Sequence, residues 1–160
     1  MEGGDARASA EFRARRVNPQ SAGQDGARTA LVARGQAMRG GKTTNYDAAS
    51  VDAAARDVAG AGLAARLMID FSHANSLKLY ENQVQVGVDV AAQLTGGEER
   101  IIGVMVESHI KAGRQDLLSG KPLEYGVSIT DGCIGWEDTV ALLESLASAA
   151  RRRRATIADR

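Results

Sequence analysis

The sequence lacks the features that mark secreted, membrane-spanning and nucleic-acid-binding proteins. A single cysteine, Cys133, excludes an internal disulfide framework and suits the reducing cytoplasm. The 20 basic residues equal the 20 acidic ones, so no net field attracts nucleic acid or an anionic membrane. No apolar run approaches the roughly 18 residues of a membrane span, and the charged residues 1–16 contain no secretory signal. We therefore expect one cytoplasmic domain with no membrane or nucleic-acid partner.

The chain divides unevenly. Residues 1–36 mix small and charged side chains without sustained apolar periodicity, which is typical of a disordered leader. Within it, the short apolar run 29–33 is compatible with a strand or with no element at all. Regular patterning covers residues 37–153, and residues 154–160 are expected to form a flexible tail.

Strand-like and helix-like segments alternate in the regular part. Short apolar runs bounded by turn residues predict buried parallel strands over 65–71 and 101–106. Helical patterns predict three helices, over 48–58 after the N-cap Asp47, over 76–94 with Val84, Val88 and Ala91 on one stripe, and over 136–151. A polar loop connects the last strand to the last helix over 107–134. This order predicts an α/β fold with a parallel sheet and outer helices.

Three polar residues stand where predicted elements end. Arg39, His73 and Glu107 each follow the one before by 34 residues, about the length of one strand–helix unit. A 34-residue period is also found in helical hairpin repeats, but strand-like runs precede His73 and Glu107. The spacing therefore predicts three neighbouring strand ends that face one cavity, where barrel enzymes keep their chemistry.

His73, Glu107 and Asp131 are candidate metal ligands. An imidazole with two carboxylates suits Mn²⁺, Fe²⁺, Co²⁺ or Zn²⁺. Three ligands do not close a tetrahedral site, so a fourth ligand or solvent completes it. The simpler alternatives are a strand-end histidine that bonds a loop carbonyl and an aspartate that shapes a turn.

The run 38–44 offers a candidate anion site. Arg39 stands beside Gly40 and Gly41, whose amides can approach a phosphate closely. A flexible turn with a solvated cation is an equal alternative. A nucleotide-binding loop is disfavoured, because its pattern requires glycine where Gln36 stands.

Three other features have plain structural interpretations. Cys133 has no neighbouring base in the sequence and is expected to be a small buried apolar residue. His109 is interpreted as a loop side chain, with a supporting role behind the metal ligands as the alternative. The basic run 151–154 is interpreted as a solvated helix end.

As a set, these residues resemble the type I 3-deoxy-D-arabino-heptulosonate-7-phosphate (DAHP) synthases, which open the shikimate pathway. The resemblance covers 39–153. Its motifs are Arg39-Gly-Gly-Lys42, Asn45-Tyr-Asp47, Met68-Ile-Asp-Phe-Ser-His-Ala-Asn-Ser76, Gly96-Gly-Glu98, Ile101-Ile-Gly-Val-Met-Val-Glu-Ser-His109, Gly120-Lys-Pro-Leu-Glu-Tyr-Gly126 and Ser128-Ile-Thr-Asp-Gly-Cys-Ile-Gly-Trp-Glu-Asp138.

The resemblance implies a (β/α)₈ TIM barrel, of which this chain supplies the C-terminal portion. It implies a transferase that joins phosphoenolpyruvate to erythrose 4-phosphate, and a homo-oligomeric parent protein. The family's metal is held by a cysteine, a histidine, a glutamate and an aspartate, and His73, Glu107 and Asp131 fall on the last three. Arg39 falls on an arginine that binds the phosphate of phosphoenolpyruvate. His73, which also has the catalytic position, and Asp131 lie against the substrates.

The resemblance also has limits. No part of the chain matches the family strand that carries the ligand cysteine, and Cys133 matches another family cysteine. Residues before Met38 match nothing in the family, which suggests a truncated or frame-shifted gene product. We therefore expect the isolated chain to be inactive. The alternative is a non-catalytic protein that keeps metal or phosphate affinity, or that serves in protein interactions.

Overall fold

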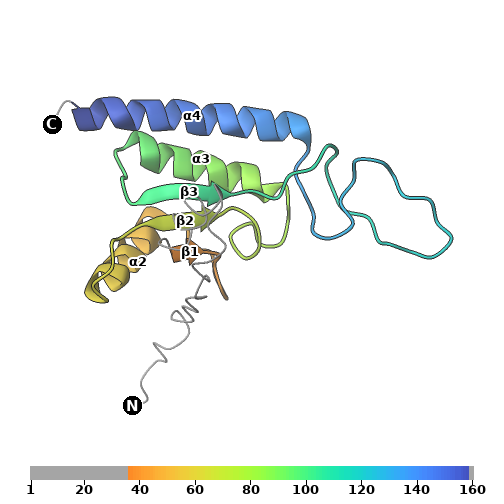
Figure 1. Cartoon of the computed structure of the whole chain (residues 1–160), viewed down its shortest axis with the longest axis horizontal. Helices are drawn as coiled ribbons and strands as arrows, with labels where there is room; N and C mark the ends of the chain where they lie inside the picture. The colour runs from red at the N-terminus through yellow and green to blue at the C-terminus, as the bar shows by residue number, and fades with distance from the viewer. Residues whose placement is uncertain (1–35, 159–160) are drawn as a thin grey trace, which may run out of the picture.

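Strands and helices alternate along residues 36–158, the part of the chain that this computed structural model describes. The elements are β1 (Gln36–Met38), α2 (Ala48–Gly60), β2 (Leu67–Asp70), α3 (Asn82–Thr95), β3 (Ile101–Met105) and α4 (Trp136–Ala158) (Figure 1). The predicted leader and short run 29–33 lie outside the described residues, apart from Gln36.

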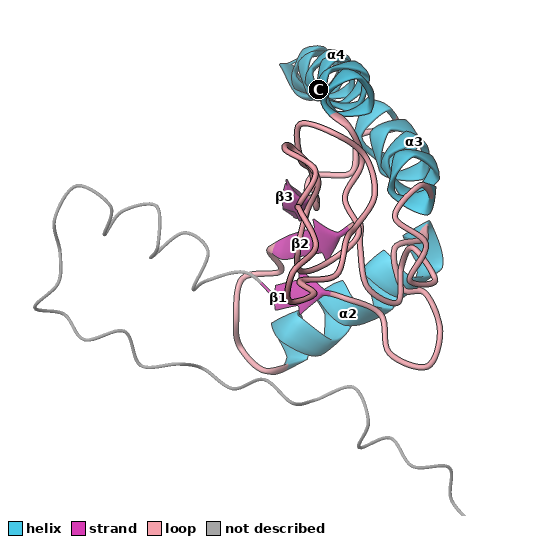
Figure 2. Cartoon of the chain, turned by 90° about the vertical axis from the view of Figure 1, so that its right-hand side faces the viewer, coloured by secondary structure: helices cyan, strands magenta, loops and turns pink. Residues whose placement is uncertain are grey.

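The three strands form one parallel sheet in the order β1-β2-β3. Figure 2 shows α2 and α3 on the same side of this sheet, and α4 lies against α3. No helix within 36–158 covers the opposite face of the sheet. Parallel strands with helices on the outside confirm the predicted α/β class.

The core fills the space between the sheet and its helices. The central strand β2 contributes Leu67 and Ile69, both fully buried, and Phe71 continues the same row. Each helix adds apolar side chains to this layer: Val51 and Ala55 from α2, Val86, Val90 and Leu94 from α3, and Leu142, Leu146 and Ala149 from α4. Burial of this layer is the main stabilising term of the fold.

The helix α2 begins as predicted. The Asp47 carboxylate accepts a hydrogen bond of 3.0 Å from the backbone N–H of Ser50, which satisfies one of the free donors at the helix start. The Ser50 hydroxyl also donates to the carboxylate at 2.6 Å, and this bond together with the backbone one lowers the pKa of Asp47, because both stabilise the charged form. Gly62, just beyond the helix, has a φ of +74° that permits the chain to reverse.

The expected start of α3 is wrong. A helix was predicted from Ser76, but turns occupy the chain until α3 begins at Asn82. Leu77 and Lys78 have φ values of 55° and 62°, in the left-handed region that interrupts a right-handed helix. The whole connection after β2 is therefore an ordered turn that shapes the site described below.

The predicted apolar stripe of α3 is also partly wrong. Ala91 is buried, but Val88 is 50% exposed. The buried face instead follows Val86, Val90 and Leu94, because α3 packs against α4 and shares one core cluster with the strands. Val88 lies on the side of α3 that faces neither the sheet nor α4.

The last helix continues beyond its predicted end. α4 runs past Arg151 to Ala158, so most of the segment expected as a tail is helical. The basic run is not wholly solvated, because Arg153 is half-buried and donates to the carbonyl oxygens of Glu98 at 3.0 Å and Ile101 at 2.8 Å. Arg153 thus fixes α4 to the start of β3.

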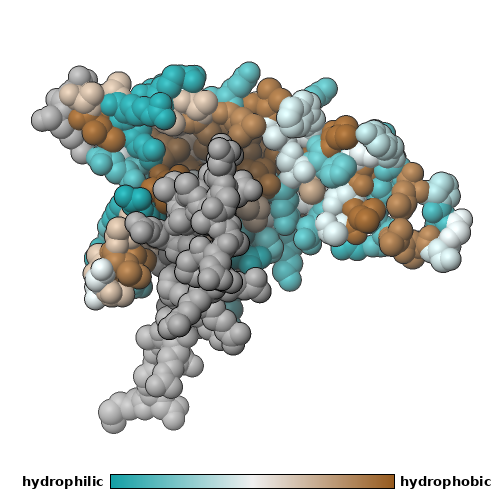
Figure 3. All heavy atoms as spheres, in the orientation of Figure 1, coloured by the Kyte–Doolittle hydropathy of each residue, from teal (hydrophilic) through white to brown (hydrophobic). Residues whose placement is uncertain are grey.

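The predicted long loop between β3 and α4 is present, and it projects from the body (Figure 1). Lys111 forms an ion pair of 2.8 Å with Glu124, and Gln115 bonds the backbone of Glu124, so the loop is internally tied. Tyr125 and Leu117 on it are 83% and 71% exposed, and Figure 3 shows brown apolar surface on the loop and near the sheet. Within residues 36–158, no helix has the length and apolar character needed to cross a membrane.

Candidate functional site

The carboxyl ends of the three parallel strands bring the predicted site residues to one edge of the sheet. Arg39 directly follows β1, His73 lies in the turn after β2, and Glu107 comes two residues after β3. Their common position follows from the parallel pairing, which places all three strand ends together. The equal spacing of 34 residues therefore reflects real neighbours.

Asp70, the last residue of β2, lies between Arg39 and His73. Its side chain is 4% exposed, and its Oδ2 accepts a hydrogen bond of 3.2 Å from Nε of Arg39. Its other oxygen, Oδ1, accepts from the backbone N–H of Ser72 at 2.9 Å. A buried carboxylate of this kind is stable when it is paired and hydrogen-bonded. Asp70 therefore fixes the direction of the Arg39 guanidinium.

His73 is positioned by an unusual backbone and by charged neighbours. Its φ of 53° lies in the left-handed region, which is uncommon for a residue other than glycine. Nε2 lies 2.7 Å from Nη2 of Arg39 and 3.9 Å from Oε1 of Glu107. The imidazole nitrogen Nε2 thus stands between the guanidinium and a carboxylate.

The other imidazole nitrogen is buried. Nδ1 of His73 lies 2.9 Å from Oδ2 of Asp70, yet the two atoms are not aligned for a hydrogen bond and Nδ1 has no other partner within the described chain. The contact is therefore an electrostatic one. It favours a proton on Nδ1, which leaves the lone pair on Nε2.

Glu107 is held by two residues, Ser72 and Gln83, that were not predicted as part of the site. Ser72 Oγ donates a hydrogen bond of 2.6 Å to the Glu107 carboxylate at Oε2. Oε1 of Gln83 accepts a hydrogen bond of 2.8 Å from the backbone N–H of Glu107, and Nε2 of Gln83 donates one of 3.0 Å to the Glu107 carbonyl. For Gln83, the sequence feature that could have indicated this role is a glutamine among the apolar positions of the predicted helix.

The Asn75 side chain connects the backbone segments that carry the site. Its Nδ2 donates to the carbonyls of Met38 at 2.9 Å and Asp70 at 2.8 Å, so it joins the ends of β1 and β2. Its Oδ1 accepts from the backbone N–H of Asn45 at 2.8 Å, and the Asn45 side chain accepts from the Gly40 amide at 2.8 Å. The turn after Arg39 is therefore anchored to the turn that carries His73.

Gly40 is required by its surroundings. Its φ is +69°, and a Cβ there would lie 2.7 Å from Cβ of Ala74 and 2.9 Å from the carbonyl oxygen of Thr43. Only glycine fits this close approach without a shift of the backbone. Lys42 is exposed in the same turn.

Asp131 is not brought into the cluster. Its side chain is exposed, and no hydrogen bond or ion pair in residues 36–158 joins its carboxylate to Arg39, His73 or Glu107. Its segment does run beside the end of β3, because the N–H of Ile134 donates to the carbonyl of Glu107 at 3.0 Å. Over the described part of the chain, no group of three or more His, Cys, Asp or Glu side chains is arranged to hold a metal ion.

Cys133 and His109 have the structural roles that were expected of them. Cys133 is buried, and burial raises the pKa of its thiol, with the charges of Glu107 and Asp131 acting in the same direction. A raised pKa keeps the sulfur protonated and unreactive near neutral pH. The Nδ1 of His109 contacts the carbonyl oxygen of Gly126 within the loop.

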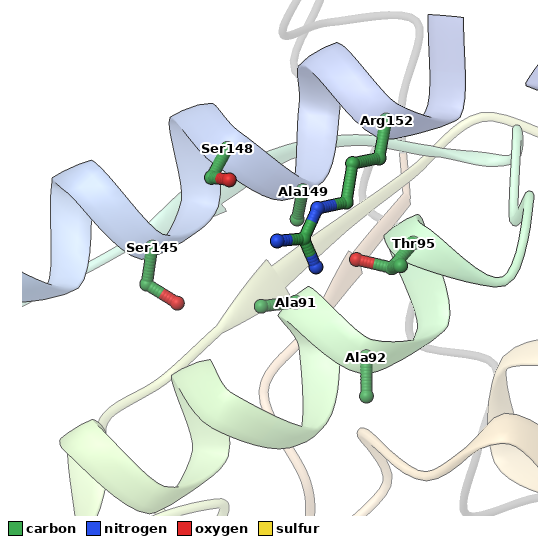
Figure 4. Close-up of a pocket in the computed structure, with 7 residues that line it drawn as sticks. All are labelled: Ala91, Ala92, Thr95, Ser145, Ser148, Ala149 and Arg152. Carbon is green, nitrogen blue, oxygen red and sulfur yellow. The ribbon is translucent and has the colours of Figure 1, made fainter. Parts of the chain in front are cut away.

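A groove lies between α3 and α4, away from Glu107. It has a volume of about 530 Å³ and is lined mostly by small side chains (Figure 4). Ala91 and Thr95 on the last turn of α3 line it, and in Figure 4 the guanidinium of Arg152 extends over it toward Thr95. This end of α3 leads into the start of β3, so the groove is at the opposite end of the sheet from Glu107.

Comparison with known proteins identifies relatives of the chain. The model of the DAHP synthetase I family matches residues 4–144 and thus includes residues before Met38, where we found no resemblance. The Phe-sensitive phospho-2-dehydro-3-deoxyheptonate aldolase of Escherichia coli K12 is 57% identical over 117 residues, which are 73% of this chain and 33% of that protein. The tyrosine-inhibited enzyme of Schizosaccharomyces pombe is 49% identical over 122 residues, 73% of this chain and 33% of the relative.

A solved structure agrees with these relatives. The phospho-2-dehydro-3-deoxyheptonate aldolase of Francisella tularensis SCHU S4 superposes with a TM-score of 0.70 at 40% identity, covering 73% of this chain and 34% of that one. The sheet and helices are consistent with a part of the α/β barrel of this family. The chain spans about a third of the length of the relatives it matches.

Proposed function

The chain belongs to the DAHP synthetase I family, and on that basis we propose that it carries part of the substrate and metal site of a DAHP synthase. The whole protein would join phosphoenolpyruvate to erythrose 4-phosphate in the cytoplasm, as a homo-oligomer. The observation that carries the proposal is the cluster of Arg39, His73 and Glu107 at the carboxyl edge of one parallel sheet.

Arg39 is proposed to bind the phosphate of phosphoenolpyruvate. Its side chain is 58% exposed, while its Nε is bonded to buried Asp70, so the guanidinium is directed but accessible. A planar guanidinium binds phosphate through paired N–H donors. The amides of Gly40 and Gly41 that the sequence suggested as further donors already donate to Oδ1 of Asn45 at 2.8 Å and to the carbonyl of Thr43 at 3.0 Å, so the proposal rests on the Arg39 guanidinium.

His73 and Glu107 fit a shared divalent ion, and Asp131 is the proposed third ligand. The 3.9 Å between Nε2 of His73 and Oε1 of Glu107 is compatible with metal bonds of about 2.0–2.2 Å from each atom. Their mixed nitrogen and oxygen donors suit Mn²⁺, Fe²⁺, Co²⁺ or Zn²⁺. When bound, such an ion supplies Lewis-acid polarisation of the sugar aldehyde.

The chain's own residues contribute orientation and charge. Asp70 keeps Arg39 directed, and Nε2 of His73 lies 2.7 Å from Nη2 of Arg39 and 3.9 Å from Oε1 of Glu107. We propose that His73 also contacts phosphoenolpyruvate, since it touches the Arg39 guanidinium that would bind the phosphate.

Titration of the full chain with Mn²⁺, followed by the electron paramagnetic resonance signal of free Mn²⁺, tests the metal site. We expect His73→Ala and Glu107→Gln each to weaken binding by at least about tenfold, because each removes a donor atom. His109→Ala is the matched control, since this second histidine contacts a loop carbonyl. Equal Mn²⁺ affinity in all four proteins would rule out the proposed ligands.

A further inference from the structure

We propose that Ser72 and Gln83 are positioning residues that set the Glu107 carboxylate for the metal. The inference rests on the proposed function, because it takes Glu107 to be a ligand. Ser72 acts on the carboxylate itself, and Gln83 acts on the backbone that carries it.

Gln83 replaces the strand pairing that ends before Glu107. β3 ends at Met105, so the backbone of Glu107 lies beyond the regular pairing with β2. The side chain of Gln83 reaches it from α3 and takes both its N–H and its carbonyl. The Glu107 backbone is therefore fixed to a helix rather than left to a mobile loop.

The burial of Gln83 shows how specific this contact is. Gln83 is 0% exposed and is surrounded by the apolar face of α3. A buried amide costs free energy unless its donor and acceptor are satisfied, and here one backbone unit satisfies both. An apolar residue would serve the core equally well, but it would leave the Glu107 N–H without its Gln83 acceptor.

Ser72 fixes the rotation of the carboxylate. Its hydroxyl donates to Oε2 of Glu107 at 2.6 Å, which leaves Oε1 facing Nε2 of His73 at 3.9 Å. Ser72 is itself 6% exposed, and its backbone N–H donates to Asp70. The turn after β2 therefore carries His73 and, through Ser72, also orients the Glu107 carboxylate.

The test measures Mn²⁺ affinity of the full chain in Ser72→Ala and Gln83→Met. We expect affinity to fall by about 10–100-fold in each, as when partners behind a metal ligand are removed. Gln85→Met, an exposed glutamine on the same helix, is the control for Gln83. Ser145→Ala, an exposed serine on α4 that lines the groove beside α3, is the control for Ser72. Both controls should stay within about twofold of the parent chain.

Amide hydrogen exchange at Glu107, followed by nuclear magnetic resonance, adds a readout that needs no metal. Gln83→Met should accelerate exchange of the Glu107 N–H, whereas Ser72→Ala should leave it protected, because only Gln83 accepts from that amide. Ser72→Ala removes one hydroxyl and keeps the backbone contacts, so it remains informative if Gln83→Met does not fold.

The outcomes separate the inference from the proposed function. If Glu107→Gln leaves Mn²⁺ affinity unchanged, the proposed function fails and this inference fails with it. If Glu107→Gln weakens binding while Ser72→Ala and Gln83→Met match their controls, the positioning roles alone are wrong. Loss of affinity in both variants, with slow exchange kept in Ser72→Ala, supports the two separate roles.

Discussion

Single buried side chains hold the edge of the sheet where the site forms. Asn75 is 2% exposed and bonds three backbone groups, on Met38, Asp70 and Asn45. These groups belong to three separate segments of the chain. One side chain therefore connects segments that strand pairing cannot connect, because they lie at and beyond the ends of the strands.

Asn75→Ala should lower the free energy of unfolding by about 2–3 kcal/mol, because it leaves buried backbone groups without partners. Gln85→Ala, which truncates an exposed amide paired with Asp89, should change it by less than about 0.5 kcal/mol. Urea denaturation at neutral pH measures both. Equal small losses would mean that water replaces the Asn75 contacts.

The sequence predicts which residues meet at the strand ends better than it predicts the side chains that hold them in place. Arg39, His73 and Glu107 follow from regular spacing, because one strand–helix unit repeats at nearly constant length. Ser72 and Gln83 do not, since their partner is the Glu107 backbone or carboxylate, reached from another element. No local pattern encodes which turn or helix face will lie against Glu107.

At the scale of elements, α3 and α4 approach each other closely at Gly87. A Cβ at this position would lie 2.2 Å from Cδ1 of Leu142 and 3.0 Å from Cε2 of Phe71. Both neighbours are core residues with 4% and 0% exposure, so neither can move freely. The glycine therefore sets the distance between the two helices and the end of β2.

Gly87→Ala should destabilise the fold by about 1–3 kcal/mol through overpacking, although alanine is the better helix former by about 1 kcal/mol. Gly60→Ala, at the end of α2 with open space around it, is the matched control and should be neutral or stabilising. Thermal unfolding followed by circular dichroism compares the two. A stabilised Gly87→Ala would show that the helices separate without cost.

Element boundaries were predictable only where a local signal exists. Asp47 caps α2 through its own side chain, so the start of that helix was correct. The start of α3 was not, because Leu77 and Lys78 adopt left-handed φ values that their residue types do not announce. That turn is closed by side-chain hydrogen bonds, among them the bond from Asn82 Nδ2 to the Ser76 carbonyl at 3.0 Å.

For the whole molecule, the important feature is the face of the sheet that no described helix covers. Ala37 and Met68 are paired neighbours on that face, since side chains alternate along each strand and Leu67 and Ile69 point to the core. Ile102, next to the register shift between β2 and β3, is 40% exposed. In a closed barrel, these positions contribute to the packed interior.

Among residues 36–158, no strand pairs with the outer edges of β1 and β3, and these edges together with the open face would make the chain, taken alone, prone to associate. We expect the purified 160-residue chain to bind a hydrophobic dye and to form no product from phosphoenolpyruvate and erythrose 4-phosphate. Coexpression with the part of the Escherichia coli Phe-sensitive relative that lies outside the aligned segment should yield a copurifying complex with reduced dye binding, because barrel strands then cover the face.

Condensation activity of that complex, followed by the disappearance of phosphoenolpyruvate, is the decisive measurement. Activity should appear in the complex and be lost when the chain carries His73→Ala, whereas His109→Ala should leave it intact, since only His73 stands among Arg39, Asp70 and Glu107. Product formed by the chain alone as a monomer would show that its own residues complete the site. A complex that forms and stays inactive would mean that Arg39, His73 and Glu107 do not reach the reacting atoms.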